Sequence, residues 1–314
     1  MKSPWIQALR SVALTVPDLA AAERFYTQVW RLAVAARDEG VLYLRGSGSD
    51  HHLLALHAAA GQPQLRQVTL RARHADALAA IAQATLAAGG QVEQAPSPAT
   101  DPAGGQHTVI RDADGRRFEI VHGDAQRTPD APAPADQPLR LAHAVLNSHA
   151  IATAQAFLEQ ALGFVLADRT RIMAFMNCNA DHHSLALGDA DNDALNHIAF
   201  VMPTLDAVMR GGGRMKDAGH GIEWGPGRHG PGDNAFNYFI DPFGIVIEYT
   251  AEVEQIDETY QPGSPGDWTW PPGRVDQWGI SAPPSARLKD AQRAVHFTLP
   301  LDLTGEPPCV SPPI

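Results

Sequence analysis

Cysteine, basic residues and long apolar runs are all scarce in this sequence. The 2 cysteines, Cys178 and Cys309, are too few for a disulfide framework and lie outside any zinc-site spacing. No segment approaches the ~18 apolar residues of a membrane-spanning helix, and the N-terminus lacks the apolar run of a signal peptide. With Lys+Arg 24 against Asp+Glu 35, the net charge of −11 disfavours binding to nucleic-acid phosphates. We therefore expect a cytoplasmic protein that binds neither nucleic acid nor membrane.

The composition predicts a folded chain with two domains. Its 314 residues are 44% hydrophobic and 19% charged, which is typical of globular proteins rather than disordered ones. A polar, Ala- and Pro-rich stretch at 123–138 indicates a linker between residues 1–122 and 139–250. Residues 251–314 are rich in Pro, Gly and Trp and predict an irregular tail. Three roles for that tail are open: a cover over a pocket, a subunit contact, or a disordered segment.

An internal repeat relates the two predicted domains. Segments of the first half recur in the same order in the second, namely 9–14 over 141–146, 19–29 over 151–161, 65–70 over 195–200 and 112–120 over 241–249. The segments at 19–29 and 151–161 have helical apolar spacing and follow a short strand. Further helices are expected near 74–88 and 204–217. The fold class is therefore predicted as α+β, with two duplicated, sheet-rich modules.

Three residues of the second module carry metal-binding chemistry. His143, His197 and Glu248 each lie in an apolar segment that predicts a buried strand. A buried carboxylate is costly unless it is paired or bound to a metal. Two imidazoles and one carboxylate form the facial triad that is typical of non-haem Fe(II) sites with open coordination positions. We therefore predict a metal site at these three residues.

The repeat provides a comparison for this site. The matching positions of the first module are Ser11, Gln67 and Glu119, and the first two cannot donate as imidazole does. We expect the first module to hold no metal. Each residue also has a plainer interpretation: a lone strand histidine is usually a hydrogen-bonded core residue, and a glutamate at a strand end can be structural. The case for a metal is that all three fall on repeat-equivalent strands of one module.

Three more residues predict acid–base chemistry near the metal. Of the neighbours His182 and His183, only one can face the same side as Leu185 and Leu187, and alternation selects His183. His229 lies in the rigid loop GPGRHGPG, and Tyr238 lies on the strand that follows. Each residue also has a purely structural interpretation. His183 can lie at a polar hairpin tip, the loop of His229 can be a simple connection, and Tyr238 can be a packed aromatic residue.

The motif GPGRHG, followed by Tyr238, by Asp-Pro-Phe-Gly and by Glu248, resembles the type I extradiol ring-cleavage dioxygenases. These enzymes belong to the vicinal oxygen chelate (glyoxalase, bleomycin resistance, dioxygenase) superfamily, and the similarity is strongest to the homoprotocatechuate 2,3-dioxygenase branch. The resemblance implies two tandem modules of paired βαβββ repeats, with the metal lost from the first.

The same resemblance implies an activity and the residues that carry it. The expected reaction is O2-dependent cleavage of a catechol beside its two hydroxyls, in aromatic catabolism, at Fe(II) with Mn(II) as the alternative. His143, His197 and Glu248 match the metal ligands, and the catalytic residues match His183, His229 and Tyr238. A homo-oligomer is expected, as for many soluble enzymes.

Four positions depart from the homoprotocatechuate branch. Val145 replaces an Asn, Trp224 replaces an Arg that helps hold a substrate carboxylate, Phe175 replaces a Trp, and Asn237 replaces an aliphatic residue. Trp224 and Phe175 favour a more apolar ring substituent. Two other functions are weighed against the dioxygenase: a glyoxalase-like metal-dependent isomerase or lyase, which O2 uptake would distinguish, and a metal-free ligand-binding protein, which metal content would distinguish.

Overall fold

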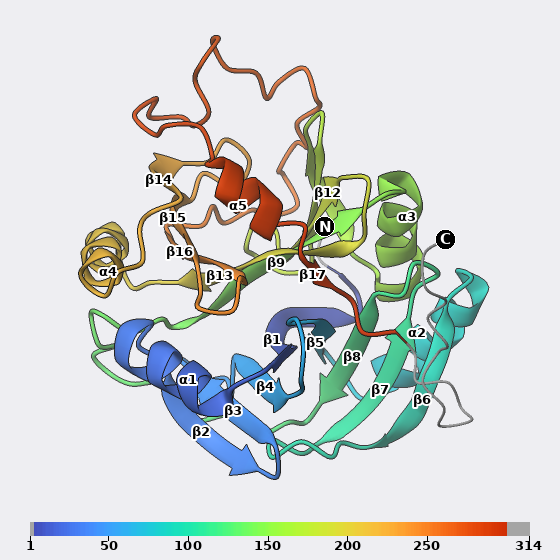
Figure 1. The fold of residues 1–314 in the computed structure, drawn as a ribbon. Helices are drawn as coiled ribbons and strands as arrows, with labels where there is room; N and C mark the ends of the chain where they lie inside the picture. Colours follow the sequence, from blue (N-terminus) through green and yellow to red (C-terminus); the bar gives the residue numbers. More distant parts are fainter. Residues whose placement is uncertain (1–2, 300–314) are drawn as a thin grey trace, which may run out of the picture.

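The computed structural model describes residues 3–299, which form two mixed β-sheets, one for each copy of the repeat (Figure 1). The strand order is β2-β3-β4-β1-β5-β8-β7-β6 in the first sheet and β10-β11-β12-β9-β13-β16-β15-β14 in the second. The two orders correspond strand by strand. The predicted α+β fold of two tandem vicinal oxygen chelate modules is confirmed.

The first sheet belongs to the lower, blue-to-green half of Figure 1. Its strands are β1 Ile6–Val16, β2 Ala33–Asp38, β3 Val41–Arg45, β4 Leu54–Ala58, β5 Leu65–Ala72, β6 Gln91–Pro98, β7 Gln106–Arg111 and β8 Arg117–His122. The strand β1 pairs antiparallel with β5 at the middle of the sheet and parallel with β4 on its other side. Two βαβββ units therefore meet along β1 and β5.

The second sheet repeats this arrangement in the upper half of the view. Its strands are β9 Arg140–Ser148, β10 Val165–Arg169, β11 Met173–Asn177, β12 Leu185–Asp189, β13 Ala194–Val201, β14 Trp224–Arg228, β15 Ala235–Ile240 and β16 Val246–Ala251, with β17 Val295–His296 added beside β13. Here β9 and β13 are the antiparallel central pair, and β13 and β16 run parallel.

Helices form at the four segments where they are predicted, near 19–29, 74–88, 151–161 and 204–217, whereas a further short helix lies in the tail that is predicted to be irregular. Their bounds are α1 Leu19–Arg24, η1 Phe25–Val29, α2 Asp76–Ala87, α3 Ile151–Leu162, α4 Leu205–Asp217 and α5 Ala286–Ala291. Thr204 begins α4 by accepting a hydrogen bond from the Ala207 amide at 3.1 Å. Gly219, with φ +88°, follows the end of the same helix in a backbone conformation that favours glycine. The segment η1 is a π-helix, so the helix predicted over 19–29 changes its winding after Arg24.

One hydrophobic core extends through both modules. Trp30, at the end of the first module's helical segment, is fully buried and stacks on Tyr249 of the second module, with ring centroids 3.6 Å apart. The Tyr249 hydroxyl donates to the Trp30 carbonyl at 2.7 Å, and Phe200 packs against the edge of the indole. The modules therefore stabilise each other through a continuous apolar interface.

The linker and the tail contact both modules. Residues 123–138 contain no helix or strand, and the Pro138 carbonyl accepts a hydrogen bond from the Ser47 amide at 2.9 Å. The division of the chain at this stretch stays a prediction. In the tail, α5 packs against β15, and the Thr298 amide then donates to Leu65 of the first module.

The tail from residue 300 onward, with Cys309, lies outside the described residues. Cys178 is free and buried. Within residues 3–299, no helix has the length and apolar character that crossing a bilayer requires.

Replacing Trp30 by Ala will lower the free energy of unfolding by about 3–5 kcal/mol, because it opens a cavity where the two modules meet. Denaturant titration followed by circular dichroism measures this loss. Ile280→Ala is the control, because Ile280 is 70% exposed and its loss should change stability by less than about 0.5 kcal/mol. A Trp30 variant as stable as the control would contradict the shared core.

Candidate metal centre

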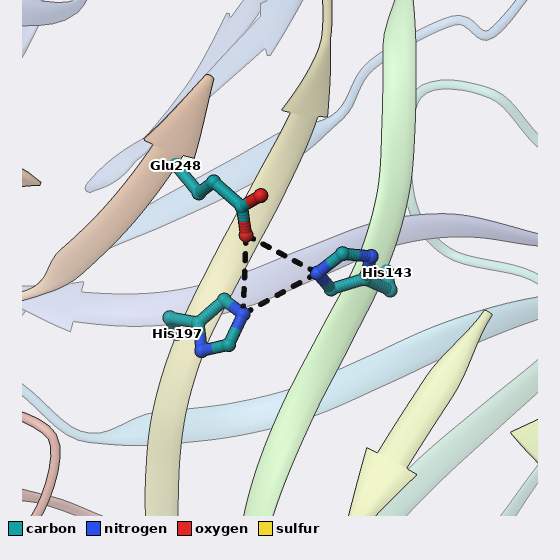
Figure 2. Close-up of side chains that lie close together, drawn as sticks. All are labelled: His143, His197 and Glu248. Atoms are coloured by element: carbon teal, nitrogen blue, oxygen red, sulfur yellow. Dashed lines mark hydrogen bonds and ion pairs between the residues drawn. The ribbon is translucent and has the colours of Figure 1, made fainter. Parts of the chain in front are cut away.

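Strand register brings the three predicted ligands to one face of the second sheet. Ala199 of β13 lies opposite His143 of β9 on one side and opposite Glu248 of β16 on the other. His197 precedes Ala199 by two residues, so its side chain projects from the same face. Figure 2 shows the three side chains converging from these neighbouring strands.

The donor atoms form a nearly equilateral triangle. His143 Nε2 lies 3.3 Å from His197 Nε2, and each of these atoms lies 3.3 Å from Glu248 Oε2 (Figure 2). The centre of this triangle is about 1.9 Å from each atom, close to the ~2.0–2.2 Å at which imidazole and carboxylate bind a divalent ion. All three side chains are buried, so bulk water does not solvate the donor atoms.

The protonation states of Glu248 and His197 favour binding of a cation. Burial alone would raise the pKa of Glu248, but its contacts with His143 and His197 outweigh burial and hold that pKa below its ordinary value. Burial lowers the pKa of His197, which favours the neutral imidazole that binds metals. Asn196 Oδ1 lies 2.8 Å from His197 Nδ1 and can accept a hydrogen bond from the Nδ1 proton. The unprotonated Nε2 is then free to bind a metal. The three residues therefore fit a divalent ion.

A cavity of about 380 Å³ opens beside the triangle, and His183, His229 and Tyr238 all line it. His229 Nε2 lies 3.1 Å from the Tyr238 hydroxyl, which in turn lies 3.3 Å from His197 Nε2. The His183 ring packs against His143 with centroids 4.4 Å apart. Five of the six predicted site residues therefore line one cavity, and the sixth, Glu248, contacts two of them; their roles stay predictions.

The pKa values around the cavity favour neutral side chains. Burial lowers the pKa of His229 to about 4, and burial with the neighbouring histidines places the pKa of His183 well below its ordinary value. Burial, together with the nearby Glu248 charge, raises the pKa of Tyr238. Near pH 7 the cavity therefore presents two imidazoles that can accept protons and one phenol that can donate a hydrogen bond.

The expectation that His183 shares a face with Leu185 and Leu187 is wrong, because both leucines belong to the hydrophobic core on the other face of β12. The two histidines precede that strand, and their side chains take different directions. His183 lines the cavity, whereas His182 points into a buried network in which its Nε2 lies 2.8 Å from Asp168 Oδ2. The two Nδ1 atoms are 3.0 Å apart. The tail contributes to this network, because the Tyr260 hydroxyl donates to Asp168 at 3.0 Å.

Several cavity residues escape prediction from the sequence. Asn196 faces the cavity beside His197 because the β9–β13 register shifts between Leu195 and His197, a bulge that turns both neighbours inward. Lys289 and Gln292 of the tail also line the cavity. They have no counterpart in the repeat, so the comparison of modules gives no signal for them.

The matching positions of the first module are each hydrogen-bonded to protein groups, and two of them, Gln67 and Glu119, bond to each other. Gln67 Nε2 donates to Glu119 Oε2 at 2.6 Å, and the Thr69 hydroxyl donates to the same oxygen at 3.0 Å. His107 Nδ1 lies 2.6 Å from the other oxygen of Glu119. Ser11 accepts from Arg10 at 2.9 Å. Glu119 is therefore held by protein donors where Glu248 faces two imidazoles.

A second cluster, near the surface, also contains potential metal donors: Asp114, His149 and Asp193. The guanidinium of Arg116 contacts both acids, at 2.8 Å from Asp114 and 2.7 Å from Asp193. The positive charge a cation would bring is thus already supplied by the protein, and we assign no metal to this cluster.

The fold and the site together define a family. The chain belongs to the Glyoxalase/Bleomycin resistance protein/Dioxygenase superfamily, whose model matches residues 8–120 and 140–249, one match per module.

Particular relatives include extradiol dioxygenases, so the resemblance predicted from the GPGRHG motif is confirmed. Metapyrocatechase 2 of Cupriavidus necator is 28% identical over 310 residues, covering 88% of this chain and 90% of the relative. A Mn(II)-bound glyoxalase from Novosphingobium aromaticivorans is 32% identical, with a TM-score of 0.84 over 90% of this chain and 94% of that one.

A third relative supports the fold alone. A variant of homoprotocatechuate 2,3-dioxygenase from B. fuscum, in complex with HPCA, has a TM-score of 0.83 at 22% identity, covering 97% of this chain and 85% of that one.

Replacing Glu248 by Gln will abolish stoichiometric metal binding, because a neutral amide replaces the single charged ligand. The wild type should hold about one ion per chain after anaerobic reconstitution with Fe(II), measured by plasma mass spectrometry after desalting. Glu119→Gln is the matched control, since it makes the same change at the equivalent strand position of the first module and should leave the metal content intact. Equal metal loss in both variants would contradict the assignment.

Proposed function

We propose that the protein is an extradiol dioxygenase that opens a catechol-type ring with O2 at a non-haem Fe(II) held by His143, His197 and Glu248. The observation that supports this most is the buried triangle of two imidazoles and one carboxylate, open on one side to a cavity bordered by neutral acid–base groups. When bound, the metal supplies a Lewis acid that lowers the pKa of a coordinated diol and also offers a position for O2. Mn(II) suits the same donors.

His229 and Tyr238 are placed to take part in deprotonating the diol. Their 3.1 Å contact joins a neutral imidazole to a phenol at the edge of the donor triangle. The imidazole accepts a substrate proton, and the phenol donates a hydrogen bond to the resulting oxygen. Trp224 and Phe236 pack around the His229 ring and hold its orientation.

His183 is the proposed proton donor and acceptor for the reacting oxygen atoms. It lines the same cavity as Tyr238, its ring is tilted against that of His143, and Phe175 contacts it edge-on with ring centroids 5.0 Å apart. Its depressed pKa keeps the imidazole neutral near pH 7, so the ring is free to accept a proton from the substrate, and it then releases that proton readily. Both oxygen atoms of O2 end in the ring-opened product.

The cavity walls favour an apolar ring substituent. Its lining includes the apolar side chains of Val145, Ile172, Met173, Phe175 and Trp224. None of these side chains can bind a carboxylate, as the sequence comparison with the homoprotocatechuate branch predicts. The exposed Lys289 contributes one ammonium group at the tail side of the cavity.

A glyoxalase-like isomerase or lyase is the second candidate, since one relative is a Mn(II)-bound glyoxalase at 32% identity. Anaerobic reconstitution with Fe(II), followed by exposure of a panel of catechols to O2, separates the candidates. We expect one O2 consumed per diol and a yellow product whose mass equals diol plus O2. Conversion without O2 uptake would favour the isomerase, and absence of bound metal would favour a ligand-binding protein.

Replacing His183 by Phe will reduce turnover by about 10²–10⁴-fold, because the change removes an acid–base group while keeping a similar ring. Metal content should stay at the wild-type level, since His183 is not a ligand. Oxygen-electrode assays and metal analysis on the same preparation measure the two effects. His149→Phe is the control, because His149 is an exposed histidine that does not line the cavity. Full activity in the His183 variant would contradict its role.

Replacing Trp224 by Arg will shift substrate preference toward catechols with a carboxylated substituent. The ratio of kcat/KM for 3,4-dihydroxyphenylacetate over 4-methylcatechol should rise by about 10–200-fold, the range that one pocket contact supports. Steady-state O2 uptake with both substrates measures the ratio. An unchanged ratio would show that Trp224 does not border the ring substituent.

A further inference from the structure

The first module contains a cavity of its own, at the place that corresponds to the metal centre. Its volume is about 370 Å³, close to that of the cavity in the second module. Ser11, Gln67 and Glu119, the counterparts of the metal ligands, all line it. Duplication has therefore left two cavities on equivalent strands, of which only one has the imidazole donors.

Charge distinguishes the two cavities at three other strand positions. In both modules the first and fourth strands pair in the same register, Val12 with Leu54 and Ala144 with Leu185, so equivalent residues can be identified directly. The first-module cavity has a basic group at each of three positions where the second module has a neutral residue, namely His57 for Gly188, Arg66 for Asn196 and Arg117 for Val246.

A bulge directs one of these groups into the cavity. The β1–β5 register shifts between Ala13 and Leu14, where Ala13 pairs with Gln67 and Leu14 pairs with Leu65. Arg66 is the extra residue, so both Arg66 and Gln67 face the cavity instead of pointing to opposite sides. The second module has the same bulge at Asn196, which shows that the position is built into the fold.

Arg66 is the uncompensated charge in this cavity. Within residues 3–299 it contacts no carboxylate, whereas Arg117 is paired with Glu93 at 2.5 Å. Partial burial and the nearby Arg117 lower the pKa of Arg66, as expected for two guanidinium groups that face each other. Burial and the same two arginines lower the pKa of His57 to about 4, so near pH 7 it is a neutral donor beside them.

The acids of the cavity do not neutralise Arg66. Glu119 is occupied by Gln67, Thr69 and His107, as described above, and Asp101 forms an ion pair with Arg10 at 2.6 Å. Asp38 is exposed, and its carboxylate accepts from the Glu39 amide. A partly buried guanidinium with no acidic partner is most stable when an anion binds to it.

We propose that the first-module cavity is a binding site for a small organic carboxylate, separate from the metal centre. The carboxylate lies against the guanidinium groups of Arg66 and Arg117 and accepts a hydrogen bond from His57. The organic body packs on Ala13 and Ala55, together with the Tyr43 ring that borders them. These apolar walls favour an organic acid over inorganic phosphate, which would leave them without a partner.

Calorimetric titration of the full-length protein with benzoate tests this site. Wild type should bind benzoate saturably, and Arg66→Ala should weaken binding at least about tenfold, since a charge-assisted hydrogen bond contributes ~1.5–3 kcal/mol. Arg66→Lys should retain part of the affinity. Arg37→Ala is the matched control, because Arg37 is an exposed arginine of the same sheet that pairs with Glu23 outside the cavity, and it should bind as wild type does.

Two further titrations separate this site from the metal centre and from a general anion site. Benzoate affinity should be the same in metal-free and Mn(II)-loaded protein; affinity that depends on the metal would place the ligand in the second module and overturn the proposal. Inorganic phosphate should bind more weakly than benzoate. Stronger phosphate binding, no saturable benzoate binding, or unchanged binding in Arg66→Ala would each overturn it, whatever the enzyme's activity.

Discussion

The structure of the site depends on one constraint, the burial of the Glu248 carboxylate among three neighbouring strands. A charge in that position requires compensation, and the strand register supplies it by placing His143 and His197 at 3.3 Å. Those contacts keep the carboxylate ionised and point two imidazole nitrogens at one oxygen. The cavity, with its neutral histidines and its phenol, lies beside this point, where a bound cation would replace these contacts.

Duplication followed by divergence explains how one fold supports two different cavities. A bulge between the two central strands of each sheet turns two neighbouring residues toward the cavity. The modules use it differently: Asn196 contacts His197, whereas Arg66 places a positive charge at the cavity. The glutamate persists at both positions. The partners of the two glutamates differ: Glu119 belongs to a hydrogen-bonded network, whereas Glu248 lies next to two imidazoles.

Much of this arrangement could be predicted because the repeat constrains the strands strongly. Aligning the two halves identifies His143, His197 and Glu248 as equivalent in position to Ser11, Gln67 and Glu119. Alternation does not account for His183, because that residue precedes β12 and the leucines of the strand face the core instead of the cavity. The tail could not be predicted in this way. Lys289 and Gln292 line the cavity because the six-residue helix α5 packs beside it. That packing joins residues far apart in the sequence, and no local sequence pattern predicts it. The π-helical turn after Arg24 also has no signal that we can identify.

A crystal structure of the Fe(II)-reconstituted protein, with anomalous diffraction recorded at the iron edge, tests the central claim most directly. The account predicts one strong anomalous peak per chain, bonded to His143 Nε2, His197 Nε2 and a Glu248 oxygen, with its remaining positions facing the cavity. A peak among Asp114, His149 and Asp193, a peak in the first-module cavity, or no peak at the triangle would contradict it.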